Sequence, residues 1–155
     1  MVNEKLKYLR FAAYRLMNFE SPEQDDSVQS LHRVWDEAAD AVRRCSQCLD
    51  SGKSLPLEEK AELLLTSLVC QQVGIRDYAL LDQTIDAIYA LLPRISDTHL
   101  RLHLLVHLYS ETEDESLLSD IEALLSDFHP CDVEDHYLLR TYHDVKECMT
   151  YENRF

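Results

Sequence analysis

Apolar side chains recur three or four positions apart along almost the whole chain, which is the spacing of one face of an α-helix. Seven such stripes can be traced, through residues 6–16, 31–49, 61–69, 78–92, 100–108, 117–128 and 138–149. No segment keeps the alternation of apolar and polar residues, bounded by Asn-Gly or Asp-Gly turns, that a β-hairpin requires. The pattern therefore predicts an all-α fold of about seven amphipathic helices.

The stripe at 100–108 differs from the others, because apart from Arg101 its apolar side chains occupy nearly the whole circumference of a helical wheel. We therefore expect this helix to be the central one. A polar edge interrupts the apolar surface, and it consists of His99, His103, His107 and Ser110. We call its three histidines the His ridge and expect this edge to face solvent or a groove.

Several helix ends are marked in the sequence. Ser21–Gln24 and Thr112–Glu115 both have the form of a capping box, in which two side chains satisfy free backbone N–H groups at a helix start. Ser96 and Asp132 are further candidates for the residue that caps a helix N-terminus. These signals place helix starts near each of the four positions.

The four prolines lie 34, 37 and 37 residues apart, at Pro22, Pro56, Pro93 and Pro130. Each interval can hold one pair of antiparallel helices, which is the length of a helical-hairpin repeat. A shift of 37 residues places Leu68 on Leu105, although any two amphipathic hairpins of equal length would align some leucines, so a repeat origin stays open. In either case we expect antiparallel hairpins packed in a helical bundle, as a single domain over residues 1–155.

The net charge of the protein limits the kinds of macromolecule that it can bind. The chain has 29 acidic and 15 basic side chains, which gives a formal net charge of −14. Nucleic acids are bound through Lys and Arg that neutralise phosphates, so this charge argues against direct nucleic-acid binding. An acidic surface attracts basic partners instead, and we expect a protein partner with a basic surface.

Composition also argues against an enzyme. Only two glycines are present, too few for the Gly-rich phosphate loop of P-loop or Rossmann proteins. No serine lies in the Gly-flanked turn of a hydrolase nucleophile. We therefore expect a non-catalytic protein that needs no cofactor.

The start of the chain and the cysteines bear on the compartment. The segment Met1–Lys7 is charged, and no apolar run has the length of a signal peptide or a membrane span. Five cysteines without regular spacing suit reduced thiols better than a disulfide framework. Both observations predict a cytoplasmic protein that does not bind a membrane.

The His ridge is one candidate for metal binding. His99, His103 and His107 follow one another at i, i+4, a spacing that can present two imidazoles to one ion. A third ligand would have to come from another helix, and the sequence has no HExxH or ExxH pattern to supply it. The simpler interpretation is a set of polar residues hydrogen-bonded to neighbours, with a metal-binding helical protein as an alternative. A protonated ridge would be a cationic seam that tunes partner binding near pH 6.

Cys45 and Cys48 form a CxxC pair, but the pair lies late in a predicted helix, where Cys45 continues the apolar stripe. A redox CxxC pair needs a helix N-terminus to lower the thiol pKa, so core packing is the simpler interpretation. A zinc site that joins the pair to His129 and Cys131 is an alternative, although nothing in the sequence brings these segments together.

The acidic residues gather between the predicted helices, in segments 20–26, 111–115 and 132–135. Helix capping and solvation explain most of them. We call the four acids of the second segment the acidic turn, and they are Glu111, Glu113, Asp114 and Glu115. The acidic turn and the His ridge are the candidate protein-binding residues.

The segment from Asp77 to Pro93 is similar to the second helix of a tetratricopeptide hairpin, with Tyr78 near its start and a proline at its end. Bulky residues stand where such repeats have small ones, so any repeat would be degenerate; they are Val69, Leu81 and Ile88. This resemblance implies an alternative function, a helical-repeat adaptor that binds a protein or peptide in a groove.

Three leucine-rich segments, 62–68, 86–93 and 100–109, the last leading into the acidic turn, resemble the UpxZ family of Bacteroides. The members are small helical proteins that antagonise NusG-like transcription antiterminators of capsular polysaccharide loci. The resemblance implies an inhibitor that binds such an antiterminator and blocks its action on RNA polymerase at non-cognate capsule operons. It carries over no functional residue, and it leaves the cognate partner and the oligomeric state open.

Overall fold

The computed structural model describes residues 4–17, 28–52, 54–74 and 76–152. In these residues the chain forms seven α-helices and two 3₁₀ helices and no strand, so the predicted all-α fold is confirmed. In chain order they are α1 (Glu4–Met17), α2 (Val28–Asp50), α3 (Leu57–Gln71), α4 (Tyr78–Leu91), η1 (Leu92–Arg94), α5 (Thr98–Thr112), η2 (Glu115–Leu117), α6 (Leu118–Leu125) and α7 (Val133–Glu152). None of them is long and apolar enough to cross a membrane.

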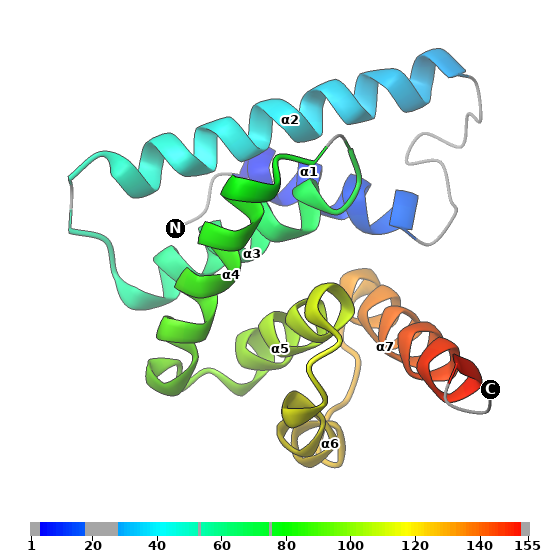
Figure 1. Ribbon diagram of the computed structural model, residues 1–155. Helices are drawn as coiled ribbons and strands as arrows, with labels where there is room; N and C mark the ends of the chain where they lie inside the picture. The colour runs from blue at the N-terminus through cyan, green and yellow to red at the C-terminus, as the bar shows by residue number, and fades with distance from the viewer. Residues whose placement is uncertain (1–3, 18–27, 53, 75, 153–155) are drawn as a thin grey trace.

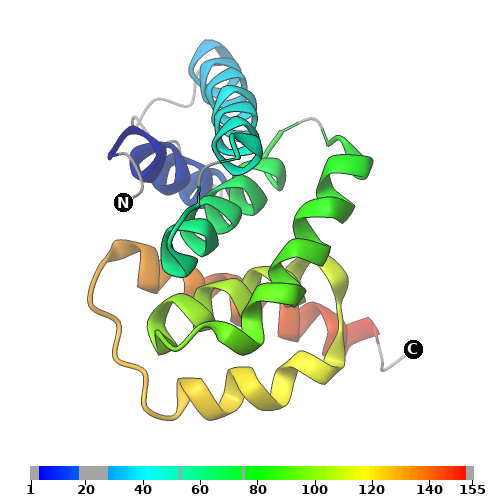
Figure 2. The ribbon, with the colours of Figure 1, turned by 90° about the vertical axis from the view of Figure 1, so that its left-hand side faces the viewer.

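The helices form two groups (Figures 1 and 2). On one side α1, α2 and α3 pack against one another, and on the other side α5 packs against α6 and α7. The chain reverses direction from α2 to α3 and again from α5 to α6, as the predicted antiparallel hairpins require. Contacts of α3 with α5 and of α1 with α7 join the two groups.

Helix α5 is the central element, as its sequence predicted. Nine of its side chains are buried: Leu100, Leu102, His103, Leu104, Leu105, Val106, His107, Leu108 and Tyr109. A helix that is apolar on all sides is stable only when other helices cover it on all sides. Here α3, α6 and α7 do so, and each fully buried leucine contributes roughly 1.5–3 kcal/mol.

The helix starts agree with the sequence at one position and differ at another. Asp132 precedes α7 and its Oδ1 accepts from the N–H of Asp135 at 2.9 Å, which confirms it as a cap. Ser96 was expected to cap α5, but the cap is Asp97, whose Oδ1 accepts from the N–H groups of His99 and Leu100. A carboxylate is the stronger acceptor at a helix N-terminus, because it also complements the helix dipole.

The predicted capping box at Thr112–Glu115 is wrong. Thr112 is the last residue of α5, where its hydroxyl donates to the carbonyl of Leu108 at 2.7 Å. Glu113 then takes a left-handed conformation with φ of 54°, which ends the helix. Asp114 caps η2 by accepting from the N–H of Ser116 at 3.0 Å. The other predicted box, Ser21–Gln24, lies outside the described residues.

Candidate functional site

The His ridge does not form a solvent-facing edge. His103 is 3% exposed and His107 is fully buried, so the expectation is wrong for these two, and only His99 is exposed. Tyr14 from α1 and Asp135 from α7 cover this side of α5 and supply hydrogen-bond partners. Buried imidazoles are tolerated when such partners are present.

These side chains belong to a continuous series of hydrogen bonds through the interior. The Tyr14 hydroxyl lies 3.0 Å from Nδ1 of His103 and 2.9 Å from Nε2 of His107. Nε2 of His103 lies 2.8 Å from Oδ1 of Asp135. The series continues at the other end, where Nδ1 of His107 lies 3.0 Å from Oε1 of Gln72.

Gln72 completes the series, since its Nε2 donates to Oε2 of Glu111 at 3.1 Å. We call this set the buried polar chain, and in order it consists of Asp135, His103, Tyr14, His107, Gln72 and Glu111. It links the first turn of α7 to the last turn of α5 by way of α1 and the end of α3. The sequence could not reveal it, because Tyr14 lies 89 residues from His103.

Burial shifts the pKa values of the three inner residues of the buried polar chain, His103, Tyr14 and His107. Burial lowers the pKa of His107 to about 3, and the charges of His103 and Arg10 act in the same direction. Burial also raises the pKa of Tyr14 well above its usual value, so its hydroxyl keeps its proton. Burial lowers the pKa of His103, against the opposing effect of its contact with Asp135.

An ion-pair cluster fixes α1, which carries Tyr14. The guanidinium of Arg10 is buried and lies 2.6 Å from Oε2 of Glu62 on α3 and 3.4 Å from Oε2 of Glu134 on α7. Burial opposes its charge, but the two carboxylates raise the pKa of Arg10. Arg10 is one helical turn from Tyr14, so the cluster positions the tyrosine between the histidines.

The acidic turn has two kinds of residue. Glu111 accepts hydrogen bonds from Gln72 and from Arg76, and its side chain is only 9% exposed. Asp114 accepts from the Tyr89 hydroxyl at 2.8 Å besides capping η2. Glu113 and Glu115 are exposed. The turn therefore offers two exposed carboxylates to a partner, while its other two acids hold the structure together.

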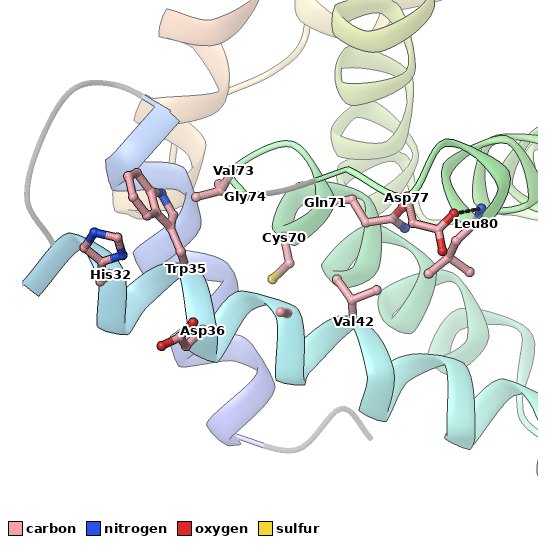
Figure 3. A pocket seen from close by; sticks show the side chains of 11 residues that line it. His32, Trp35, Asp36, Val42, Cys70, Gln71, Val73, Gly74, Asp77 and Leu80 are labelled. Atoms are coloured by element: carbon pink, nitrogen blue, oxygen red, sulfur yellow. Dashed lines mark hydrogen bonds between the residues drawn. The ribbon is translucent and has the colours of Figure 1, made fainter. Parts of the chain in front are cut away.

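A cavity of about 590 Å³ opens between α2 and the segment that joins α3 to α4. Figure 3 shows His32 and Trp35 at one end of it and Asp77 and Leu80 at the other. The indole of Trp35 is 40% exposed and meets the His32 ring edge-on, with centroids 5.1 Å apart. The sequence placed Trp35 in the core stripe of α2, so it did not predict this pocket.

Cys45 packs in the hydrophobic core, as the sequence predicted. Cys45 and Cys70 are buried, and burial raises the pKa of each thiol to about 12. Cys48 is exposed. Within the described segments, no group of possible metal ligands includes a cysteine or His129.

The described segments contain one group of three possible metal ligands, formed by His99, His103 and Asp135. One ligand atom from each lies within 4.8 Å of the others. His107 is not a member, and its two ring nitrogens lie within hydrogen-bond distance of Tyr14 and Gln72. The third ligand thus comes from α7, which the sequence pattern of α5 alone could not indicate.

Fold and site together define an acidic all-α protein with a polar interior chain and two exposed acids on a turn. The chain matches no protein-family model, and no curated protein matches its sequence. Its structure is similar to the crystal structure of the transcription anti-terminator antagonist UpxZ from Bacteroides uniformis, with a TM-score of 0.69 and 20% sequence identity. The match covers 93% of this chain and 91% of that chain. The resemblance to the UpxZ family is thus confirmed as a likeness of fold.

Proposed function

We propose that this protein is a non-catalytic regulator that binds a transcription antiterminator and blocks its action. The observation that carries the proposal is the likeness to an anti-terminator antagonist over nearly the full length of both chains. One fold can serve many functions, so the surface has to supply the rest of the argument. The described surface presents exposed carboxylates at the end of the central helix.

The proposed partner is a NusG-like antiterminator of a capsular polysaccharide locus, and the proposed place of action is the cytoplasm. Such a factor works beside RNA and RNA polymerase, so it needs basic surface. The net charge of −14 complements that surface and would speed the encounter of the two proteins. The same charge would keep the regulator itself away from nucleic acid.

The proposed contact includes the exposed part of the acidic turn. Glu113 and Glu115 are exposed, whereas Glu111 and Asp114 are engaged in hydrogen bonds within the protein. A substitution of all four acids would therefore confuse a loss of binding with a loss of stability. The informative variant changes only Glu113 and Glu115.

The test measures association of the full chain with purified NusG-like antiterminators by biolayer interferometry. At about 0.02 M salt we expect the double variant Glu113→Gln, Glu115→Gln to associate about two to ten times more slowly than the unchanged protein. At about 0.5 M salt the difference should shrink, because the charges are screened. Circular dichroism should show the same helix content for both proteins.

A matched control removes the same two charges elsewhere. Asp50 and Glu58 are exposed at the turn between α2 and α3, and Asp50→Asn with Glu58→Gln leaves the acidic turn intact. Equal slowing by both double variants would mean that overall charge, not the acidic turn, guides the encounter. Failure of the unchanged protein to bind any antiterminator would refute the proposed function.

A further inference from the structure

The direction of the hydrogen bonds in the buried polar chain can be worked out from Glu111. Gln72 donates to this carboxylate through Nε2, so its carbonyl oxygen is left to accept from His107. His107 therefore carries its proton on Nδ1. A neutral imidazole has one N–H and one lone pair, so Nε2 of His107 accepts from the Tyr14 hydroxyl.

The hydrogen bonds at the other end of the buried polar chain are directed by the Tyr14 hydroxyl. The Tyr14 oxygen has given its only proton to His107, so it accepts from Nδ1 of His103. A neutral His103 then has a lone pair at Nε2. That lone pair points at Oδ1 of Asp135, which is 2.8 Å away and is itself an acceptor.

Two acceptors therefore face each other where both side chains are buried. The buried polar chain has a carboxylate at each end, Asp135 and Glu111. The neutral side chains between them cannot donate a hydrogen bond to both carboxylates. A cation has to lie between His103 and Asp135, either a proton or a metal ion.

His99 adds a second ring nitrogen at the same oxygen. Its Nε2 lies 2.6 Å from Oδ1 of Asp135, and it stands one helical turn before His103 on α5. We propose that Nε2 of His99, Nε2 of His103 and Oδ1 of Asp135 bind one Zn²⁺ ion, which joins α5 to α7. The proposal does not depend on the proposed function.

The ligand set fits the coordination chemistry of zinc. Two imidazoles and one carboxylate are a recurrent set, with Zn–N and Zn–O distances of about 2.0–2.2 Å. Around a tetrahedral ion the ligand atoms lie roughly 3.3 Å apart. Oδ1 of Asp135, now 2.6 Å from His99 and 2.8 Å from His103, would therefore move back from the two rings by roughly 0.5–0.7 Å. His99 can also adjust, since its side chain is 49% exposed. The exposed side leaves the fourth position open to water.

The surroundings supply the support that metal ligands need. A ligating histidine usually donates its other ring N–H to an acceptor that fixes its orientation. His103 does so to Tyr14, and the direction derived above is the one that metal binding at Nε2 requires. The second oxygen of Asp135 accepts from the backbone N–H of Cys131 at 2.9 Å, which holds the carboxylate in place.

The test uses the full chain after treatment with a chelator and dialysis. Zn²⁺ is titrated at pH 7 by isothermal calorimetry and by competition with a chromogenic chelator. We expect one ion per chain with a micromolar or lower Kd. Co²⁺ as a second probe should give the visible absorption of a site with nitrogen and oxygen ligands.

His99→Ala is the main variant, because His99 is exposed and its loss should leave the fold intact. We expect this change to weaken zinc binding by about tenfold or more. His136→Ala is the matched control: His136 is an exposed histidine next to Asp135 on α7 and is outside the group of three. We expect its zinc affinity to equal that of the unchanged protein.

Three results would overturn the proposal. The first is the absence of stoichiometric zinc binding. The second is zinc binding that His99→Ala leaves intact. The third is a zinc-treated protein in which ¹⁵N NMR still shows protons on both ring nitrogens of His103, because the cation at this point would then be a proton.

Discussion

Tyr14 places one hydroxyl between two histidines that are buried in the same helix. The hydroxyl is within hydrogen-bond distance of both rings, and the tyrosine itself is fully buried. Both ring nitrogens would lose this hydrogen-bond partner if the oxygen were absent. A buried polar atom without a partner carries its full desolvation cost.

Tyr14→Phe should therefore lower the free energy of unfolding by about 1–3 kcal/mol, although it removes only one oxygen. The measurement is urea denaturation followed by circular dichroism. Tyr8→Phe is the control, because Tyr8 lies on the same helix and is 52% exposed, and its change should be within about 0.5 kcal/mol. Equal stability of the Tyr14 variant and the unchanged protein would contradict the derived hydrogen bonds.

His107 makes stability depend on pH in a defined direction. Its pKa is about 3 in the folded protein, against about 6.5 in an unfolded chain. Between these values the unfolded state binds a proton that the folded state excludes, so stability falls as the pH falls. From pH 7 to pH 5 the part due to His107 is about 2 kcal/mol.

Urea denaturation of the unchanged protein and of His107→Gln at pH 7, 6 and 5 tests this dependence. We expect the variant to be less stable at pH 7, because it disturbs the buried polar chain. We also expect it to lose less stability on acidification than the unchanged protein does. Parallel pH dependences for the two proteins would show that folding does not lower the pKa of His107.

Hydrophobic periodicity predicted all seven helices, because six of them have one apolar face that others cover and α5 is apolar on nearly all sides. It did not show which apolar side chains of α2 are buried, because it placed Val34 and Trp35 in one stripe. Val34, Ala38 and Cys45 are buried, whereas Trp35 lies at the pocket. Residues one position apart face different sides of a helix, and only packing against other helices decides which side is covered.

The His ridge failed for a related reason. Its polarity predicted a solvent-facing edge, but partners from distant segments bury it: Asp135 lies 32 residues from His103 along the chain, and Tyr14 lies further away. For a metal site the sequence showed no third ligand beside the histidines of α5. The packing of α7 on α5 supplies it in Asp135. The prediction that the acidic turn and the His ridge bind a partner stays a prediction.

Substitutions at the start of α5 test whether Asp97 caps this helix. Asp97→Ala removes the carboxylate that accepts from His99 and Leu100, and we expect a loss of about 1 kcal/mol in unfolding free energy. Ser96→Ala, at the residue first assigned as the cap, should change stability by less than about 0.5 kcal/mol. Thermal and urea denaturation can measure both. A larger effect at Ser96 than at Asp97 would contradict the observed cap.

At the scale of the whole molecule, residues from all seven helices contribute to one cluster of buried side chains. We therefore propose that residues 1–155 form a single domain, as expected from the sequence. The buried polar chain crosses this cluster from α7 to the end of α5. The acidic turn begins where that chain ends, at Glu111, so the exposed acids stand on a firmly held part of the molecule.

The proposed function is that the protein acts by binding an antiterminator. Its most direct test is transcription in vitro through a terminator, with purified RNA polymerase, a NusG-like antiterminator and increasing amounts of this protein. We expect readthrough to fall to the level without antiterminator as the protein approaches one copy per antiterminator, and to be unaffected when the antiterminator is omitted. The proposal would be contradicted if readthrough stayed constant at a large excess of folded protein with every antiterminator from the same organism.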